Sequence, residues 1–581
     1  MTSKKPTVRS HIEIALAESR KIFILVGAFS LVINLLMLTG PLYMLQIYDR
    51  VLTSASLDTL VLLTALATGL IFAQSLLEFV RNRLLARLAT RLDNRVSVQV
   101  MEAVVTHNLA KENRSAGHSL RDLDTLKGFL SGPGLVAFFD APWTPLFMAA
   151  IFLIHPLLGV VALAGGLTLF ILTAVGEIMT RRAYADASVH AQAGASFADA
   201  SLSNAEAIEA MGMMPQVLRR WRAHHDATLA ATAKAAERAA GLTAAAKFLR
   251  PILQIAMLGF GAWLVIRQEI TPGVMIASSI IMGRALAPVE ALISQWRNIV
   301  AARSVYGRLK ELLQTGADVG EAMSLPRPRG RLSVENVIAA PPGHSKATVQ
   351  NVSFALEPGE TLGVIGPSGA GKSTLARLLT GAWRPVAGQV RLDGVNIAKW
   401  RSAERGPFVG YLPQGVELFE GTVAENIARL GEPVSEMVLK AAAEAGAHDM
   451  ILRLSEGYET RIGPGGRTLS AGQRQRVALA RALYGDPAFI VLDEPNANLD
   501  QEGEQALRRA ILTVKARGAT VILIAHHTSI LGVCDKLLVL QNGRAEAFGG
   551  RDAVLAQLTR GPAETASDKG AARGIRAVDA P

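Results

Sequence analysis

Cysteine is almost absent from this sequence, and that scarcity excludes several kinds of site. The 581 residues contain one cysteine, Cys534. A single thiol cannot form an intrachain disulfide, and it leaves no cysteine cluster to hold zinc or an iron–sulfur centre. A reducing, cytosolic setting for the C-terminal half fits this composition.

Charged residues are also scarce. They make up 19% of the chain, whereas 50% of the residues are hydrophobic, a balance that indicates a membrane protein with a soluble part. The net charge of +11 does not indicate a nucleic-acid surface, because the basic residues are spread along the chain and flank apolar runs. We therefore expect contact with membrane lipid and no nucleic-acid partner.

The sequence contains six apolar runs that are long enough to span a bilayer. They cover residues 22–48, 57–80, 132–154, 157–179, 248–266 and 271–296. A signal peptide would have a shorter apolar region and a small-residue cleavage site, so we predict that the first run is a retained span.

Lysine and arginine residues set the expected orientation of these spans. Arginines follow the second, fourth and sixth runs, whereas the other connections carry few positive charges. We therefore predict that the termini and the two long connections, residues 81–131 and 181–247, face the cytoplasm. The composition of both connections favours helices that continue the spans, with loose loops as the alternative.

Two charged residues, Arg284 and Glu290, lie within the sixth run on either side of Pro288. Charged groups that face lipid are costly, so we expect both to face an inner, hydrated surface or a partner. One interpretation is that they line a cavity for a transported molecule. The other is that they reach the nearby cytoplasmic interface by extending their side chains.

Composition divides the chain into five predicted segments. A cytoplasmic N-terminal segment (1–20) precedes a membrane domain (21–314), and a linker rich in proline and arginine (315–330) follows it. Residues 331–560 alternate strand and helix patterns, as an α/β domain with a parallel sheet does. Residues 561–581 have no aromatic residue and are predicted to be a disordered tail.

A phosphate loop stands near the start of the α/β domain. The motif G-x-x-x-x-G-K-[ST] lies between a strand pattern (361–365) and a helix pattern, the context in which this motif binds phosphate. The backbone N–H groups of its loop can surround an anion, Lys372 can reach the β- and γ-phosphates, and the Ser373 hydroxyl can bind Mg²⁺. The predicted nucleotide-binding residues are Gly366, Pro367, Ser368, Gly369, Ala370, Gly371, Lys372, Ser373 and Thr374.

A second strand pattern, residues 489–493, ends in two carboxylates, Asp493 and Glu494. A strand in the same sheet would deliver Asp493 beside the phosphate loop, where it can hold Mg²⁺. Glu494, one residue further, can polarise the water that attacks the nucleotide. We predict that Asp493 is a metal ligand and that Glu494 is the catalytic base.

The further motifs of this domain resemble those of the ATP-binding-cassette ATPases. Leu469-Ser470-Ala471-Gly472-Gln473 resembles the signature motif, and Tyr411-Leu412-Pro413-Gln414, Asn498-Leu499-Asp500 and His526 resemble the Q-loop, the D-loop and the switch histidine. The resemblance implies a head-to-tail homodimer in which ATP and Mg²⁺ lie between the phosphate loop of one copy and the signature of the other.

The resemblance also implies roles for these residues. Ser470, Gly472 and Gln473 would contact the nucleotide held by the partner copy. Gln414 would sense the γ-phosphate and bind Mg²⁺, and His526 would hold the γ-phosphate in line. Asp500 would bridge the two cassettes. The implied fold class is an all-α six-helix transmembrane domain of the ABC exporter type fused to an α/β P-loop nucleotide-binding domain.

Three positions depart from the usual pattern of this family. Pro341 stands where an aromatic residue commonly stacks on adenine, so the selectivity for the base is expected to be relaxed. Ala471 replaces the first glycine of the signature pair, a change small enough to allow close approach. Pro464 stands where many exporters carry a glutamate, so contact with the spanning domain there is expected to be apolar.

The membrane half is similar to the PrtD-type permease/ATPases of bacterial type I secretion. The similarity is carried by residues 39–51 (TGPLYMLQIYDRV) and 139–143 (FDAPW), together with 493–500 (DEPNANLD). It implies a bacterial inner-membrane exporter that works with a periplasmic membrane fusion protein and an outer-membrane channel to secrete an unfolded protein. An N-terminal cysteine peptidase, which some peptide exporters carry, is not expected, because no cysteine precedes Cys534.

Two other functions compete with protein export. The same architecture could export a lipid or a drug. A cassette protein could also use ATP as a conformational switch without transport, although six apolar runs argue against that class.

Overall fold

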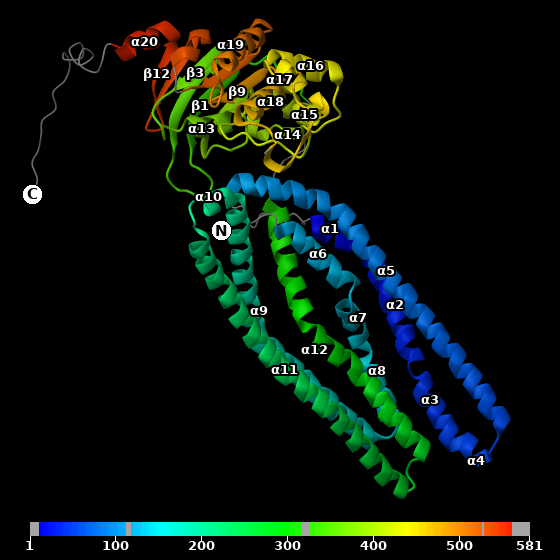
Figure 1. The fold of residues 1–581 in the computed structure, drawn as a ribbon. Coiled ribbons are helices and arrows are strands. Elements are labelled where there is room, and N and C mark those ends of the chain that lie inside the picture. The colour runs from blue at the N-terminus through cyan, green and yellow to red at the C-terminus, as the bar shows by residue number, and fades with distance from the viewer. Residues whose placement is uncertain (1–10, 112–117, 316–324, 467, 526–527, 560–581) are drawn as a thin grey trace, which may run out of the picture. The chain divides into compact units, whose positions relative to one another are not determined.

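The computed structural model describes residues 11–111, 118–315, 325–466, 468–525 and 528–559. They form two compact units that divide near residue 318. The first unit is helical, and the second combines strands with helices (Figure 1). The predicted fold class is therefore confirmed. His526 and the predicted disordered tail (561–581) lie outside the described residues.

The first unit is built from helices that follow one another along the chain. Their bounds are α1 His11–Glu18, α2 Arg20–Leu36, α3 Thr39–Gln46, the π-helix η1 Ile47–Val51, α4 Leu52–Ser54, α5 Leu57–Lys111, α6 His118–Ser131, α7 Pro133–Asp140, α8 Thr144–Ile154, α9 Pro156–Ser203, α10 Ala205–Ala210, α11 Met214–Ile266 and α12 Pro272–Thr315.

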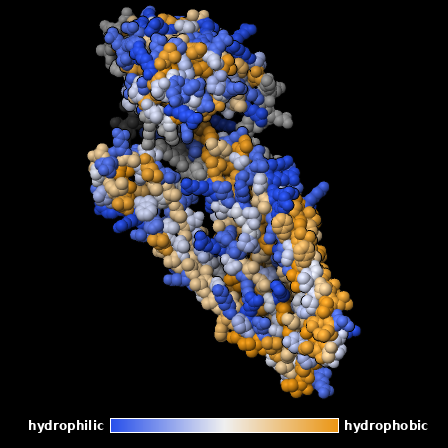
Figure 2. Space-filling view, turned by 45° about the vertical axis from the view of Figure 1, so that its right-hand side comes forward, coloured by the Kyte–Doolittle hydropathy of each residue, from blue (hydrophilic) through white to orange (hydrophobic). Residues whose placement is uncertain are grey.

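Six helical stretches of this unit are long and apolar enough to cross a membrane, as the sequence predicted. Several helices are much longer than the apolar runs, and α5 has 55 residues. At about 1.5 Å per residue α5 is roughly 80 Å long, whereas the hydrocarbon core of a bilayer is about 30 Å thick. Apolar side chains cover much of the surface of the long helices (Figure 2).

Helix α12 lies at the centre of the unit, in contact with α3, α6, α7, α8, α9 and α11. A buried ion pair joins three other helices. The guanidinium of Arg81 on α5 donates to Asp140 on α7 (2.8 Å) and to Ser30 on α2 (3.0 Å). Arg81 is the first of the arginines that follow the second apolar run, and it is only 5% exposed, because Asp140 compensates its charge inside the helix bundle.

The second unit contains two main sheets. The strands are β1 Leu332–Ala339, β2 Val349–Leu356, β3 Thr361–Ile365, β4 Ala387–Leu392, β5 Val395–Asn396, β6 Val409–Leu412, β7 Gly421–Thr422, β8 Arg461–Ile462, β9 Phe489–Asp493, β10 Thr520–Ile524, β11 Lys536–Gln541 and β12 Arg544–Gly550. The helices are α13 Lys372–Leu379, α14 Ser402–Arg405, α15 Val423–Ile427, α16 Ser435–Glu444, α17 His448–Leu452, α18 Ala471–Leu483, α19 Gln501–Ala516 and α20 Arg551–Thr559.

The larger sheet has the order β12-β11-β3-β10-β9-β6. Its pairs are parallel except for β12, which is an antiparallel edge strand. Every residue of β9 and β10 is buried, as expected for central strands covered on both faces. The smaller sheet, β2-β1-β4-β5, is antiparallel. The sequence did not predict this second sheet, because its pairing depends on the register between separate strands, and β3 and α13 lie between β2 and β4 in the chain.

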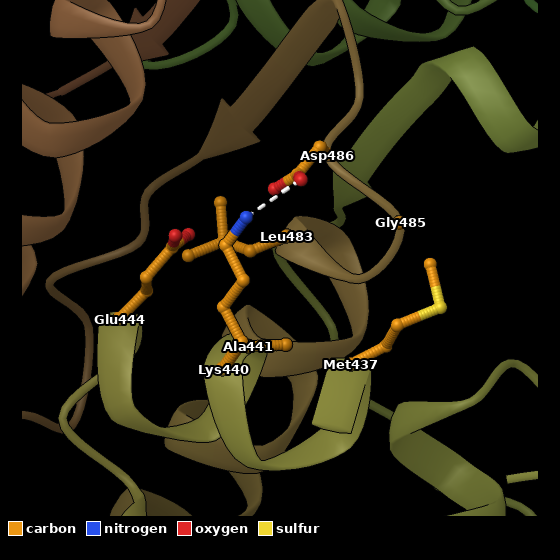
Figure 3. Close-up of a pocket in the computed structure, with 7 residues that line it drawn as sticks. All are labelled: Met437, Lys440, Ala441, Glu444, Leu483, Gly485 and Asp486. Atoms are coloured by element: carbon orange, nitrogen blue, oxygen red, sulfur yellow. Dashed lines mark hydrogen bonds and ion pairs between the residues drawn. The ribbon is translucent and has the colours of Figure 1, made fainter. Parts of the chain in front are cut away.

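A network of charged residues links α16, α19 and the turn before β9. The Arg517 guanidinium lies 2.8 Å from Glu444 and 2.8 Å from Asp486, and the Lys440 ammonium lies 2.6 Å from Asp486 beside a small pocket (Figure 3). Burial raises the pKa of the Asp486 carboxyl, but the Lys440 hydrogen bond and the Arg517 charge outweigh it, so the pKa is lowered. The stabilisation by Asp486 is therefore present near neutral pH and is lost as the pH falls through this lowered pKa.

We predict that Arg517→Met destabilises the second unit by about 3 kcal/mol, because the substitution leaves the mostly buried Glu444 carboxylate without its cation. Urea unfolding of the detergent-solubilised chain, followed by tryptophan fluorescence, measures the change. Arg331→Met is the matched control: its pair with Glu357 is exposed and contributes less than about 1 kcal/mol. Equal effects of the two substitutions would contradict the prediction.

Candidate functional site

The phosphate loop connects β3, in the middle of the larger sheet, to the N-terminus of α13. Gly371 precedes the first residue of α13 and has φ 99°, in the region that favours glycine. A Cβ atom at this position would lie 2.5 Å from the carbonyl oxygen of Thr348. Only glycine therefore fits, and the helix N-terminus stays open to an anion.

Lys372 is the first residue of α13 and is only 5% exposed. Its ammonium donates to the carbonyl oxygens of Gly366 (2.8 Å) and Pro367 (2.9 Å). Burial lowers the pKa of Lys372, and the charges of Glu494 and Asp493 oppose that shift. The backbone carbonyls thus hold the Lys372 ammonium at the loop, close to where a bound phosphate would lie.

Asp493 ends β9 and is 1% exposed. One of its oxygens, Oδ1, is buried and has no hydrogen-bond partner among the described residues, while the carboxylate interacts with the Ser373 hydroxyl. Burial raises the pKa of this carboxyl, and Ser373 opposes the shift. A buried carboxylate oxygen without a partner beside a serine hydroxyl fits a site for Mg²⁺.

The described residues contain no group of three or more histidine, cysteine or acidic side chains arranged to hold a metal.

Glu494 follows Asp493 and has φ 51°, an uncommon backbone conformation for a residue other than glycine. Its N–H donates to the Ile524 carbonyl oxygen (3.0 Å), which extends the pairing of β9 with β10 by one residue. Its carboxylate accepts a hydrogen bond from the Gln414 amide (3.1 Å). The structure therefore brings together Glu494 and Gln414, two of the predicted site residues that lie far apart in the sequence.

The signature residues form the start of α18. The Ser470 hydroxyl accepts a hydrogen bond from the Gln473 N–H (3.3 Å), and the Gln473 side chain accepts one from the Ser470 N–H (2.9 Å). This capping box satisfies backbone groups at the helix N-terminus. Ser470 is exposed and Gly472 is half-buried, so this end of α18 is open to a partner.

Asp500 caps α19 by accepting a hydrogen bond from the Gly503 N–H (2.8 Å) and pairs with Arg476 of α18 (2.8 Å). Sequence reasoning missed this second contact, and it also missed the hydrogen bond from the Gln475 amide to the Pro495 carbonyl oxygen (3.2 Å). The spacing of Gly472, Gln475 and Arg476 at i, i+3 and i+4 was a usable signal, because it places all three on one helix face.

Pro341 lies in a turn between β1 and β2, where the His344 N–H donates to its carbonyl oxygen (3.0 Å). The residue is half-buried and offers no aromatic face to a nucleotide base. Pro464 opens a short helical turn, Pro464–Gly466, that precedes the signature motif.

Two family profiles match the chain. The profile described as "ABC transporter" matches residues 349–497, and the profile described as "ABC transporter transmembrane region" matches residues 23–288. Together they cover the phosphate loop, the carboxylate pair and most of the helical unit.

Curated relatives match over nearly the whole chain. The "Type I secretion system ATP-binding protein PrsD" of Rhizobium meliloti is 46% identical over 94% of both chains. The "Cyclolysin secretion/processing ATP-binding protein CyaB" of Bordetella pertussis is 30% identical over 93% of this chain and 77% of its own.

A solved structure has the same fold. It is described as a bacterial Atm1-family ABC exporter with ATP bound, and it superposes with a TM-score of 0.82 over 96% of this chain and 100% of its own. At 24% sequence identity, this likeness concerns the fold alone.

We predict that Pro341→Tyr lowers the KM for ATP by about tenfold, since stacking of an aromatic ring on a base contributes about 1–3 kcal/mol. Steady-state hydrolysis of ATP and GTP by the purified chain measures the change. The neighbouring substitution Pro342→Tyr adds the same ring one position away and should leave the KM unchanged. A similar response of both variants would show that Pro341 does not lie beside the base.

Proposed function

The chain belongs to the ABC transporter family, and from this membership we propose that it is the ATPase of a type I secretion system that exports an unfolded protein. The observation that carries the proposal is the identity of 46% over 94% of both chains to a type I secretion ATP-binding protein. The relatives named for secretion favour a protein cargo over a lipid or a drug. A periplasmic membrane fusion protein and an outer-membrane channel would complete the export path.

Hydrolysis of ATP uses the groups at the carboxyl ends of the parallel strands. Lys372 would bind the phosphates, and Ser373, Asp493 and Gln414 would hold Mg²⁺, which would neutralise charge on the phosphate oxygens. The Glu494 carboxylate accepts a proton from the attacking water as the bond between the β- and γ-phosphates breaks. His526 is proposed to orient the γ-phosphate.

We propose that two copies of the chain form the working unit. The exposed N-terminus of α18 would face the γ-phosphate held by the partner copy, with contacts from Ser470, Gly472 and Gln473. In support, this helix end is capped within its own chain, so its geometry is in place before any partner arrives. Asp500 would lie close to the contact between the copies.

We propose a bacterial inner-membrane location with the N-terminus and the ATP-binding unit in the cytoplasm. The support is the distribution of arginine on α5, where Arg83, Arg87 and Arg91 are exposed just beyond the apolar part of the helix.

The exposed face of α12 is our candidate for the path of the cargo. Among the described residues of α12 no large apolar side chain is exposed, whereas α5 exposes Val61, Leu66 and Phe72. One face of α12 instead presents Arg284, Ala287, Ser294 and Asn298. A lipid-facing span would expose bulky apolar side chains, so this face is suited to water or to protein.

The two charged residues of α12 differ in their surroundings. Glu290 pairs with Arg250 on α11 at 2.8 Å. Arg284 is exposed, and at about 1.5 Å per residue it lies roughly 18 Å from the start of α12, near the middle of a bilayer core about 30 Å thick. Arg284 therefore lies too deep to reach the interface easily, which favours the cavity interpretation.

Glu494→Gln is expected to leave ATP binding intact and to lower the turnover number by about 10²–10⁴, the usual contribution of a general base. Binding of a fluorescent ATP analogue and phosphate release in proteoliposomes measure the two effects. Glu502→Gln, on the exposed start of α19, is the control and should hydrolyse ATP normally. Undiminished hydrolysis by Glu494→Gln would exclude this residue as the base.

Single cysteines introduced at Arg284 and Ser294 are expected to react with a charged, water-soluble maleimide, whereas cysteines at Leu66 and Phe72 are not. The native background is favourable, since Cys534 is 3% exposed and burial raises its pKa to about 12. Labelling in membrane vesicles, read by mass spectrometry, is the measurement. Protection of both α12 positions would place this face in a contact between copies instead of a hydrated path.

A further inference from the structure

One face of α18 lies against the chain segment that follows the catalytic glutamate. Gly472, Gln475 and Arg476 share this face, and each meets the segment 495–500. A Cβ atom on Gly472 would lie 2.9 Å from the carbonyl oxygen of Asn498. The signature helix is therefore in close contact with the segment along its first two turns.

The two side-chain contacts hold opposite ends of this segment. The Gln475 amide, on a side chain that is 2% exposed, donates to the Pro495 carbonyl oxygen directly after Glu494 (3.2 Å). The Arg476 guanidinium pairs with Asp500 at the far end (2.8 Å). Between them the Ala497 N–H donates to the Glu494 carbonyl oxygen (3.1 Å) and closes a turn.

Glu494 depends on this support because of its backbone. With φ 51° it occupies a sparsely populated region, and a residue other than glycine stays there only when its surroundings hold it. On one side the Glu494 N–H is held by the Ile524 carbonyl oxygen, and on the other side the Pro495 carbonyl is held by Gln475. Gln475 thus fixes the Pro495–Asn496 peptide in the middle of the turn that the Ala497 N–H closes on the Glu494 carbonyl oxygen. Loss of the Gln475 contact would let this peptide rotate, loosen the turn and move the carboxylate away from the attacking water.

We propose that Gln475 and Arg476 are positioning residues that connect the N-terminus of α18 to the catalytic carboxylate of the same chain. The inference rests on the proposed homodimer, in which that N-terminus faces the nucleotide held by the partner. The N-terminus of each α18 then contacts the nucleotide held by the partner copy. Gln475 and Arg476 of the same helix set the position of Glu494, which acts on the nucleotide held by their own chain. Closure at one ATP site is thereby transmitted, through one helix, to the glutamate of the second site.

The first test uses homodimers of the full-length chain in proteoliposomes. Gln475→Leu keeps the bulk of the side chain and removes the donor, and it should lower kcat about tenfold with little change in the KM for ATP, as expected for one lost hydrogen bond. Arg476→Met should act in the same direction, and Arg476→Lys, which keeps a cation, should restore part of the loss. Val438→Ala is the control for general destabilisation. This substitution in the core at α16 should lower the Tm and leave kcat unchanged.

The second test separates positioning from general destabilisation. Mixed dimers that carry Glu494→Gln in one chain retain one catalytic glutamate. Gln475→Leu added to the chain with the intact glutamate should lower turnover about tenfold, whereas the same change in the Glu494→Gln chain should have little effect. Equal losses in both placements, or an unchanged kcat in the homodimer, would overturn the inference. A wild-type chain that does not hydrolyse ATP would instead contradict the proposed function.

Discussion

The parallel pairing of β3, β10, β9 and β6 determines where the proposed catalytic groups of this protein lie. The carboxyl ends of neighbouring parallel strands meet at one edge of a sheet, so the segments that follow them are brought together. The phosphate loop follows β3, and Gln414 comes two residues after β6. Asp493 is the last residue of β9, and Glu494 directly follows it. Residues separated by 80 positions thus form a direct hydrogen bond, as Gln414 and Glu494 do.

This constraint also explains which features the sequence could predict. The phosphate loop, the carboxylate pair and the signature are local patterns, and each stands at a strand end or a helix start that short stretches of sequence already indicate. The six spans were predictable for the same reason, because each is a continuous apolar run.

Contacts between distant segments were not predictable in this way. The position of Arg81 after an apolar run did not indicate its buried ion pair, because its partner Asp140 lies 59 residues further on. The antiparallel sheet β2-β1-β4-β5 was missed because its pairing is set by register between strands and not by any single stretch. The contacts of Gln475 and Arg476 were missed although their spacing was visible, since the segment they hold lies 20 or more residues away.

The backbone of Glu494 shows how a local sequence pattern and contacts between distant segments depend on each other. A left-handed conformation costs about 1–2 kcal/mol for a residue with a side chain, and that strain favours release of the carboxylate from its position. The strand pairing supplies one restraint, through the Ile524 carbonyl, and the signature helix supplies the others. Each of these hydrogen bonds stabilises the fold by about 1 kcal/mol, so no single contact holds the residue securely against the strain. The geometry of this proposed catalytic residue therefore depends on the strand edge and the helix acting together, and movement of either should change turnover before it changes stability.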